Sequence, residues 1–192
     1  MHALETRLGY SFHSPALLEN ALYHSSYANE HRGAGIGSNE RLEFLGDAVL
    51  GFVTAEYLYA KHPDLPEGDL TRIRAALVCE ESLVEVAQAL GLGEYLKLGK
   101  GEEAGGGRNR PSIRADAVEA VIAAVYLDGG MEDARRLIEA VVPIADAPRV
   151  HDYKTEYQEL AQSVTGETPV YRIVGELSLI HISEPTRRRG IS

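Results

Sequence analysis

The sequence predicts an all-α protein, and three observations lead to this prediction. Two segments, residues 42–55 and 115–127, are apolar or small almost throughout and are long enough to form buried helices. Helix start and stop signals follow one another along the chain with short gaps. No alternating pattern typical of a strand is present before residue 167. We therefore expect a helical core built around the two apolar segments.

Helix signals precede the first apolar segment. The pair Ser14 and Pro15 is a typical N-cap followed by a first-turn proline, and it predicts a helix that extends to about Leu22. Residues 33–37 contain three glycines and predict a loop. Ser38 or Asn39 is then expected to cap the helix that carries the first apolar segment.

The helix of the first apolar segment is expected to be buried on most of its circumference. It nevertheless contains Glu43 and Asp47, whose spacing of four residues places both carboxylates on one face. Gly46 lies between them, although a glycine inside a helix costs about 1 kcal/mol relative to alanine. We expect Gly46 to permit the close approach of another helix or of the metal ligands. The prolines in residues 62–66 end the segment.

Further helices are expected over residues 69–78 and 81–90, and Gly91 would be the C-cap of the second. The glycine-rich stretch of residues 100–110 predicts a mobile loop. An amphipathic pattern over residues 131–142 predicts one more helix. The prolines that follow this helix indicate a linker and the end of a first domain.

The second apolar segment repeats the feature of the first. Asp116 and Glu119 are three residues apart, which again places two carboxylates on one face. If the two helices pack side by side, four carboxylates converge, and neither segment contains a lysine or arginine to neutralise them. Buried like charges require a cation or a raised pKa, and an oxygen-only ligand set suits Mg²⁺ or Mn²⁺ better than Zn²⁺. The alternative is that the acids lie on solvated faces or pair with arginines such as Arg41, Arg72, Arg74 or Arg114.

Residues 39–50, with the sequence NERLEFLGDAVL, resemble the signature of the ribonuclease III family. Residues 115–120, ADAVEA, resemble the second acidic motif of that family at the expected distance downstream. Shorter matches support the resemblance at residues 27–30, 67–70, 91–93 and 126–130. The resemblance covers roughly residues 4–176, and two acidic motifs in this order form a specific combination.

The resemblance implies a metal-dependent endoribonuclease that cleaves double-stranded RNA and processes rRNA precursors and other structured transcripts. Its expected chemistry is two-metal hydrolysis with Mg²⁺, or with Mn²⁺ in its place, giving 5′ phosphate and 3′ hydroxyl ends with short 3′ overhangs. The resemblance also implies a homodimer in which each site cuts one strand of the duplex. Phe44 is the candidate residue for the dimer interface.

Single residues acquire expected roles from the same resemblance. The acids that match the metal-binding positions of the family are Glu43, Asp47, Asp116 and Glu119. Asp47 and Glu119 would be the most critical of them for catalysis. Glu40 matches a secondary acid that is expected to form an ion pair or a dimer contact. Glu67 matches an acid near the scissile strand, and a surface charge is the alternative.

The C-terminal part of the sequence resembles the start of a second domain. Residues 149–176 resemble the first helix and first strand of a double-stranded-RNA-binding domain, an incomplete α/β unit that follows a catalytic domain of residues 1–148. Its candidate RNA contacts are Thr155, Gln158 and Glu159. Residues 177–192 resemble the translation of a sequencing adapter, so we expect a non-native tail. Within the first domain, Arg108 is a candidate for holding the RNA backbone, and a plain solvated linker is the alternative.

Composition limits the other possible functions. The single cysteine, Cys79, excludes an internal disulfide and is expected to be a small buried side chain. No signal peptide or membrane span is indicated, so we expect a soluble cytoplasmic protein. The formal net charge of −10 argues against binding to RNA phosphates, but metal-dependent nucleases concentrate acids at their site.

Two other function classes stay open at this point. A catalytically silent RNA-binding or ribosome-assembly relative would normally have lost one of the four acids, and all four are present. A helical phosphohydrolase acting on nucleotides would need histidine together with aspartate as metal ligands, and the two apolar segments contain acids only.

Overall fold

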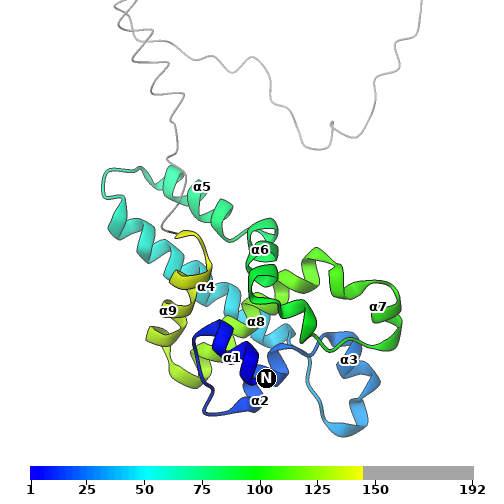
Figure 1. Cartoon of the computed structure of the whole chain (residues 1–192). Coiled ribbons are helices and arrows are strands. Elements are labelled where there is room, and N and C mark those ends of the chain that lie inside the picture. The colour runs from blue at the N-terminus through cyan, green and yellow to red at the C-terminus, as the bar shows by residue number, and fades with distance from the viewer. Residues whose placement is uncertain (145–192) are drawn as a thin grey trace, which may run out of the picture. The chain divides into compact units, whose positions relative to one another are not determined.

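The computed structural model describes residues 1–144, which form a bundle of helices (Figure 1). The chain divides into two units, Met1–Val150 and His151–Ser192, and all described residues belong to the first. The α-helices of this part are α1 (His2–Leu8), α2 (Pro15–Ala21), α3 (Ser25–Glu30), α4 (Glu40–Lys61), α5 (Glu67–Leu77), α6 (Glu80–Leu90), α7 (Lys100–Ala104), α8 (Pro111–Gly129) and α9 (Met131–Val141). Short 3-10 helices lie between them: η1 (Arg32–Ala34), η2 (Leu92–Glu94) and η3 (Gly107–Asn109). The all-α prediction is confirmed for these residues.

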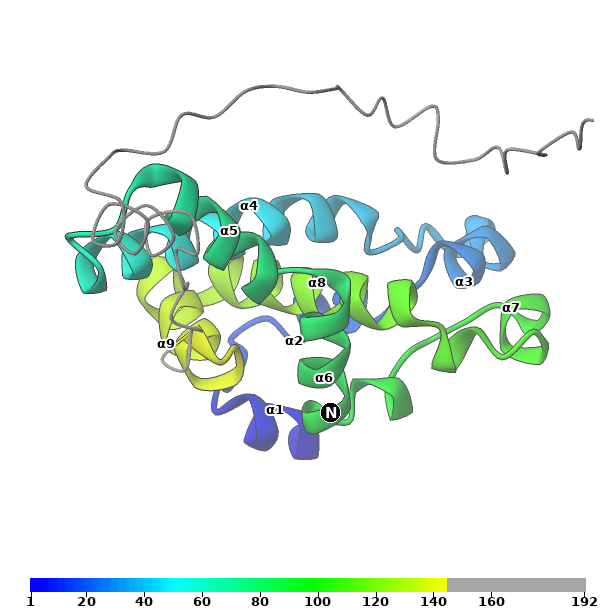
Figure 2. The same cartoon turned by 90° about the horizontal axis from the view of Figure 1, so that it is seen from above.

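The apolar helix α8 lies at the centre of the bundle. Residues 120–125 of this helix are all buried, and removing each of the larger side chains, those of Val121, Ile122 and Val125, from water stabilises the fold by about 1.5–3 kcal/mol. The long helix α4 packs along α8, and α2, α6 and α9 also pack against it (Figures 1 and 2). The two segments that the sequence identifies as apolar therefore form the central helix pair. Within residues 1–144, no helix combines the length and the apolar character that crossing a bilayer requires.

The expected helix bounds agree with the structure to within two residues for α2, α5, α6 and α9. Gly91 ends α6 with φ of 66°, as its assignment as C-cap predicts. The N-caps are less well predicted. Ser14 and Asn39 occupy the N-cap positions of α2 and α4, but neither side chain makes a capping hydrogen bond. The Asn39 amide instead donates to the Ala21 carbonyl at 3.2 Å, which links α4 to α2.

The prediction that Cys79 is a small buried side chain is also wrong in part. Cys79 is the N-cap residue of α6 and is only half-buried. Its thiol donates to the carbonyl of Ala76 at 3.2 Å. The side chain therefore lies at a helix junction rather than inside the core.

The prediction of a mobile loop over residues 100–110 is wrong. Helix α7 and the 3-10 helix η3 occupy most of this stretch. Two ion pairs stabilise it, from Arg108 to Glu103 and from Arg110 to Glu102, the second at 2.9 Å. These pairs join residues five and eight positions apart, so no helical repeat reveals them in a sequence that is rich in glycine.

The prediction that α4 is buried on most of its circumference is wrong as well. Phe44, Phe52 and Tyr59 are 80%, 54% and 77% exposed. Because they follow one another at eight and seven residues, they lie along one side of the helix, and we call them the aromatic stripe. The apolar residues of α4 thus belong to two surfaces, one packed on the core and one open.

Candidate active site

The two acid pairs meet where α4 crosses α8 at Gly46. A Cβ atom added to Gly46 would overlap the carbonyl group of Glu119 and would stand 3.0 Å from its Cα atom. Only a residue without a side chain permits this approach of two backbones. The expectation that Gly46 admits another helix is therefore confirmed, and the helix it admits carries the second acid pair.

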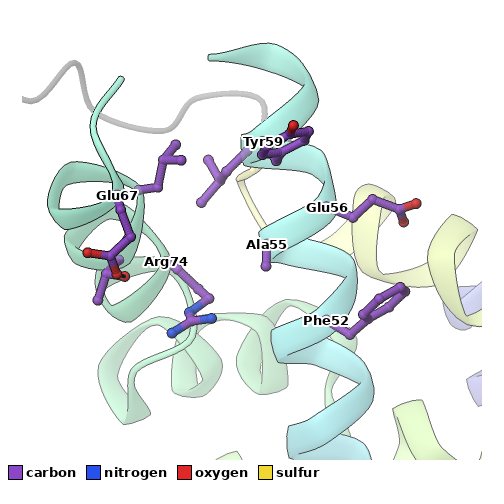
Figure 3. A pocket seen from close by; sticks show the side chains of 9 residues that line it. Phe52, Ala55, Glu56, Tyr59, Glu67 and Arg74 are labelled. Atoms are coloured by element: carbon purple, nitrogen blue, oxygen red, sulfur yellow. Dashed lines mark hydrogen bonds between the residues drawn. The ribbon is translucent and has the colours of Figure 1, made fainter. Parts of the chain in front are cut away.

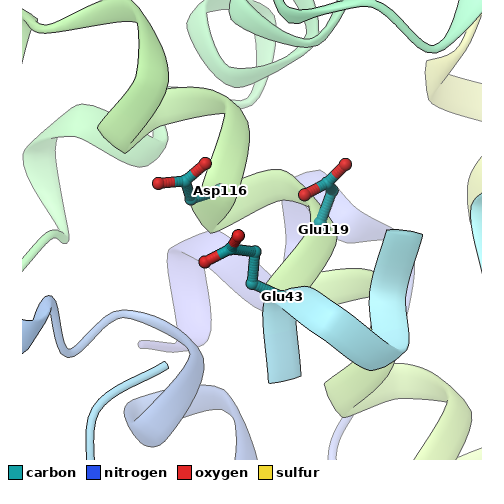
Figure 4. Close-up of side chains that lie close together, drawn as sticks. All are labelled: Glu43, Asp116 and Glu119. Carbon is teal, nitrogen blue, oxygen red and sulfur yellow. The ribbon is translucent and has the colours of Figure 1, made fainter. Parts of the chain in front are cut away.

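Three of the four expected acids form a cluster at this crossing. Carboxylate oxygens of Glu43, Asp116 and Glu119 lie within 4.8 Å of one another, and all three side chains are half-buried. Figure 4 shows Glu43 on α4 directed toward Asp116 and Glu119 on α8. We call these three residues the acid cluster. Asp47 is exposed and does not belong to the cluster, although its charge acts on Glu119.

Burial and mutual repulsion raise the pKa of each member of the acid cluster. Burial raises the pKa of Glu119 to about 7, and the charges of Asp47, Glu43 and Asp116 add to the rise. Burial likewise raises the pKa of Glu43, with Asp116, Glu40 and Asp47 contributing. The pKa of Asp116 is raised mainly by burial, against an opposing effect of His24. Without a bound cation, the negative charge of the acid cluster is therefore not compensated.

The alternative of pairing with arginine is not realised within residues 1–144. Arg72 pairs with Asp69, and Arg114 donates to the Arg108 carbonyl and the Asn109 side chain. None of the ion pairs in this part of the chain involves a member of the acid cluster. Three converging carboxylates with raised pKa values, and without a lysine or arginine partner in the described part of the chain, match the ligand set of a hard divalent cation.

The secondary acids lie outside the acid cluster. Glu40 is exposed and accepts a hydrogen bond from the Ser38 hydroxyl at 2.7 Å, and it forms no ion pair within residues 1–144. Glu67 begins α5 and lines a pocket of about 420 Å³ between α4 and α5. Figure 3 shows Glu67 and Arg74 on the α5 side of this pocket, across from Ala55 and Tyr59 of α4. The pocket thus adjoins the aromatic stripe, which supplies Phe52 and Tyr59 to its wall.

The candidate RNA-binding residues have different outcomes. The Arg108 guanidinium donates to the carbonyls of Gly93 and Leu96 and pairs with Glu103, so its donors hold the fold of its own neighbourhood. Its contact with RNA stays a prediction. Thr155, Gln158 and Glu159 lie outside the described residues. The boundary at residue 148 also stays a prediction.

Two polar residues near these elements have roles that the sequence patterns do not predict. Asp128, near the C-terminal end of α8, accepts hydrogen bonds from the Tyr10 hydroxyl at 2.9 Å and from the backbone N–H groups of His13 and Ser14 at 2.7 and 2.9 Å. It thereby holds the segment between α1 and α2. His24, the N-cap residue of α3, acts electrostatically on Asp116. A single aspartate or histidine forms no spacing pattern with other residues, so the sequence alone does not predict such a role.

The chain is similar to known ribonucleases over most of its length. The family model described as Ribonuclease-III-like matches residues 14–144. Ribonuclease 3 of Desulforamulus reducens is 49% identical over 178 residues, which are 90% of this chain and 72% of that protein. Ribonuclease 3 of Pelotomaculum thermopropionicum is 50% identical over 178 residues, covering 90% of this chain and 74% of that protein.

A solved structure agrees with the sequence comparisons. The nuclease domain of ribonuclease III from Campylobacter jejuni, which is flexible in a region involved in dimer formation, superposes with a TM-score of 0.67 at 45% identity. The match covers 73% of this chain and 97% of that chain. With the family model, the relatives and the acid cluster in agreement, this chain belongs to the ribonuclease III family of endoribonucleases.

Proposed function

We propose that this enzyme cleaves double-stranded RNA with Mg²⁺, or Mn²⁺ in its place, bound by Glu43, Asp116 and Glu119. The observation that carries the proposal is the convergence of three half-buried carboxylates, within 4.8 Å, from two helices and with no ion pair to lysine or arginine in residues 1–144. Bound divalent cations supply positive charge that activates water and stabilises the departing oxygen, and two of them serve this purpose in the proposed mechanism. The products would carry 5′ phosphate and 3′ hydroxyl groups.

Each acid of the site has its own proposed role. The backbone of Glu119 lies against Gly46, so the packing of the two helices fixes where this residue sits along α4. Glu43 and Asp116 complete the acid cluster from both helices. Asp47 lies one turn after Glu43 on the exposed side, where it is available as a fourth acid once a cation offsets the repulsion. We assign the critical catalytic roles to Asp47 and Glu119.

We further propose that the enzyme works as a homodimer in which each copy cuts one strand and leaves short 3′ overhangs. The aromatic stripe on α4 supports this assembly, because exposed aromatic side chains in a row typically mark a protein interface. The relative from Campylobacter jejuni is described as having a region involved in dimer formation. Phe44, the most exposed member of the aromatic stripe, is the proposed anchor.

The remaining assignments extend this proposal. Contacts to the duplex through Thr155, Gln158, Glu159 and Arg108, and a role of Glu67 near the scissile strand, stay predictions. The substrates would be rRNA precursors and other structured transcripts in the cytoplasm. A catalytically silent RNA-binding relative is the competing function, and the complete set of acids weighs against it.

Cleavage of a fully paired RNA at low salt tests the proposal. We expect the wild-type chain to cut only with Mg²⁺ and to leave 3′ overhangs, and Glu119→Gln to bind the same RNA without cutting it. Glu85→Gln is the matched control, since Glu85 is an exposed glutamate on α6 away from the acid cluster. Cleavage that survives in Glu119→Gln, or that persists in EDTA, would contradict the metal site.

A further inference from the structure

A pocket of about 290 Å³ lies where α6, η2 and η3 meet the first turn of α8. The longer polar side chains that line it are those of Gln88, Glu94, Arg108, Asn109 and Arg114. We call it the arginine pocket. The proposed function leaves this pocket without a role.

The arginine pocket is separate from the acid cluster. Arg114 and Asp116 are two positions apart on α8, which corresponds to about 200° around the helix. The two side chains therefore leave α8 on opposite sides. No member of the acid cluster lines the arginine pocket.

Carbonyl oxygens around the arginine pocket already accept hydrogen bonds. The Arg108 guanidinium donates to the backbone carbonyls of Gly93 and Leu96, the second at 3.0 Å. The Nε–H of Arg114 donates to the Arg108 carbonyl at 2.9 Å, and its Nη2 donates to the side-chain oxygen of Asn109 at 2.6 Å. These bonds also hold the Arg114 guanidinium in place, so little ordering is needed before it binds a ligand.

Donors of the arginine pocket, in contrast, remain available. A guanidinium has five N–H donors, and Arg114 uses two of them among the described residues. The side-chain amides of Gln88 and Asn109 donate to no protein acceptor within residues 1–144. The arginine pocket therefore has more donors than acceptors to offer a ligand.

The charges around the arginine pocket leave one arginine uncompensated. Arg108 pairs with Glu103, and Glu94 lies 3.6 Å from the guanidinium of Arg7. Arg114 forms no ion pair in the part of the chain that the structure describes. A positive charge thus lines this pocket in a chain whose formal net charge is −10.

We propose that the arginine pocket binds a phosphate group, with Arg114 as its main contact. Phosphate oxygens only accept hydrogen bonds at the protonation state of a diester or a dianion, and a planar guanidinium matches their geometry. Gln88 and Asn109 offer further donors from α6 and η3. The phosphate is either free, or carried by a small molecule, or part of an RNA backbone. The inference does not depend on the proposed metal site.

Calorimetric titration of the full chain with inorganic phosphate in EDTA tests the inference, because no metal is then present at the acid cluster to hold the anion. We expect Arg114→Leu to weaken phosphate binding by about tenfold or more, since it removes charge-assisted hydrogen bonds. Arg136→Leu is the matched control. It removes the same charge from an exposed arginine of α9 and should bind phosphate as the wild type does.

A second variant keeps the inference open to contradiction if Arg114→Leu does not fold. Gln88 is exposed, so Gln88→Glu introduces a carboxylate into the arginine pocket without disturbing the core. Repulsion between like charges should then weaken phosphate binding. Ala89→Glu makes the same change in charge at the next exposed position of α6, which does not line the pocket, and should have no effect.

The salt dependence of duplex RNA binding identifies the source of the phosphate. If the RNA backbone supplies it, Arg114→Leu should lower the slope of log affinity against log salt by about one unit relative to Arg136→Leu. If a free or small-molecule phosphate supplies it, that slope should stay the same while calorimetry still shows the loss. A wild-type chain that binds no phosphate at millimolar concentration, combined with an unchanged slope, would overturn the inference. Folded Arg114→Leu and Gln88→Glu proteins that match the wild type in both measurements would overturn it as well, and neither result would bear on the metal site.

Discussion

Gly46 of α4 and Glu119 of α8 are in contact through their backbones, with no side chain between them. The spacing of the two helix backbones that carry the acid pairs is therefore set by main-chain atoms at this crossing. A metal site built in this way depends on a residue that carries no ligand atom.

Replacing Gly46 by alanine should therefore damage both stability and metal binding. Alanine favours a helix by about 1 kcal/mol over glycine, but here its Cβ would collide with the Glu119 carbonyl group. We expect a net loss of about 1–3 kcal/mol in the free energy of unfolding, as for other overpacked sites, together with weaker Mn²⁺ binding. Urea unfolding and calorimetry measure the two effects. Gly68→Ala in α5, where a Cβ meets open space, should be neutral or stabilising, and equal behaviour of the two variants would count against the close contact.

The raised pKa of Glu119 should make the metal-free protein less stable as the pH rises. Glu119 has an ordinary pKa of 4.5 and a folded-state pKa of about 7, so the folded chain binds the proton more tightly than the unfolded chain. The stabilising contribution is complete below pH 4.5 and is lost as the pH rises to about 7. In thermal unfolding in EDTA, the melting temperature of Glu119→Gln should rise relative to that of the wild type as the pH increases from 4.5 to about 7. Parallel curves for the two proteins would show that Glu119 titrates normally.

Protons and metal should compete for the acid cluster. Because the cation binds the ionised carboxylates, Mn²⁺ affinity should increase from pH 5.5 to about 7 and change little above that value. Each binding event below pH 7 should release protons, which calorimetry in buffers of different ionisation enthalpy detects. Affinity that is independent of pH would mean that the bound cation does not contact Glu119.

A charge at Phe44 should separate the proposed dimer without unfolding the chain. Phe44 is 80% exposed, so Phe44→Arg removes little core packing. Loss of an interface anchor costs at least about 2 kcal/mol, or about 30-fold in the dissociation constant. Sedimentation velocity should show monomers, and thermal unfolding should show little change. Leu127→Arg on α8, at another exposed apolar side chain, is the control; a monomeric wild-type chain, or a dimeric Phe44→Arg, would refute this use of the aromatic stripe.

Arg108 offers a test between a structural role and RNA binding. Its side chain holds the carbonyls of Gly93 and Leu96, so Arg108→Ala should lower the free energy of unfolding by about 1–2 kcal/mol. An unchanged slope of log affinity for duplex RNA against log salt would leave Arg108 with a structural role alone. A slope that falls by about one unit would instead establish the phosphate contact predicted from the sequence. Arg32→Ala, which loses only bonds to Asn29, serves as the comparison.

The parts of the fold that the sequence predicts are those that depend on neighbours along the chain. Helix bounds, the C-cap at Gly91 and the pairing of acids on one face follow from local spacing. The close approach at Gly46 could be predicted because glycine destabilises the interior of a helix and is therefore expected there only where a side chain would not fit. On α4, apolar residues form both the face packed on the core and the exposed aromatic stripe, and the hydrophobic pattern of the sequence does not distinguish the two.

Contacts between distant residues are what the sequence does not reveal. The exclusion of Asp47 from the acid cluster depends on how α4 is rotated about its axis against α8, which the spacing of residues along one helix does not specify. The order of residues 100–110 depends on ion pairs with no periodic spacing. The hydrogen bonds of Asp128 to residues 10–14 join positions more than a hundred residues apart.

The attachment of the first residues to Asp128 has a consequence for protein engineering. Helix α8 carries Asp116 and Glu119 in its N-terminal half, and its other end bonds to the segment between α1 and α2. Trimming the chain to its family signature would leave the Asp128 carboxylate without these donors and would uncover the apolar surface beneath Leu4, Leu8 and Phe12. A minimal nuclease cut from this protein must therefore keep its N-terminal helix, although that helix contributes no acid to the cluster.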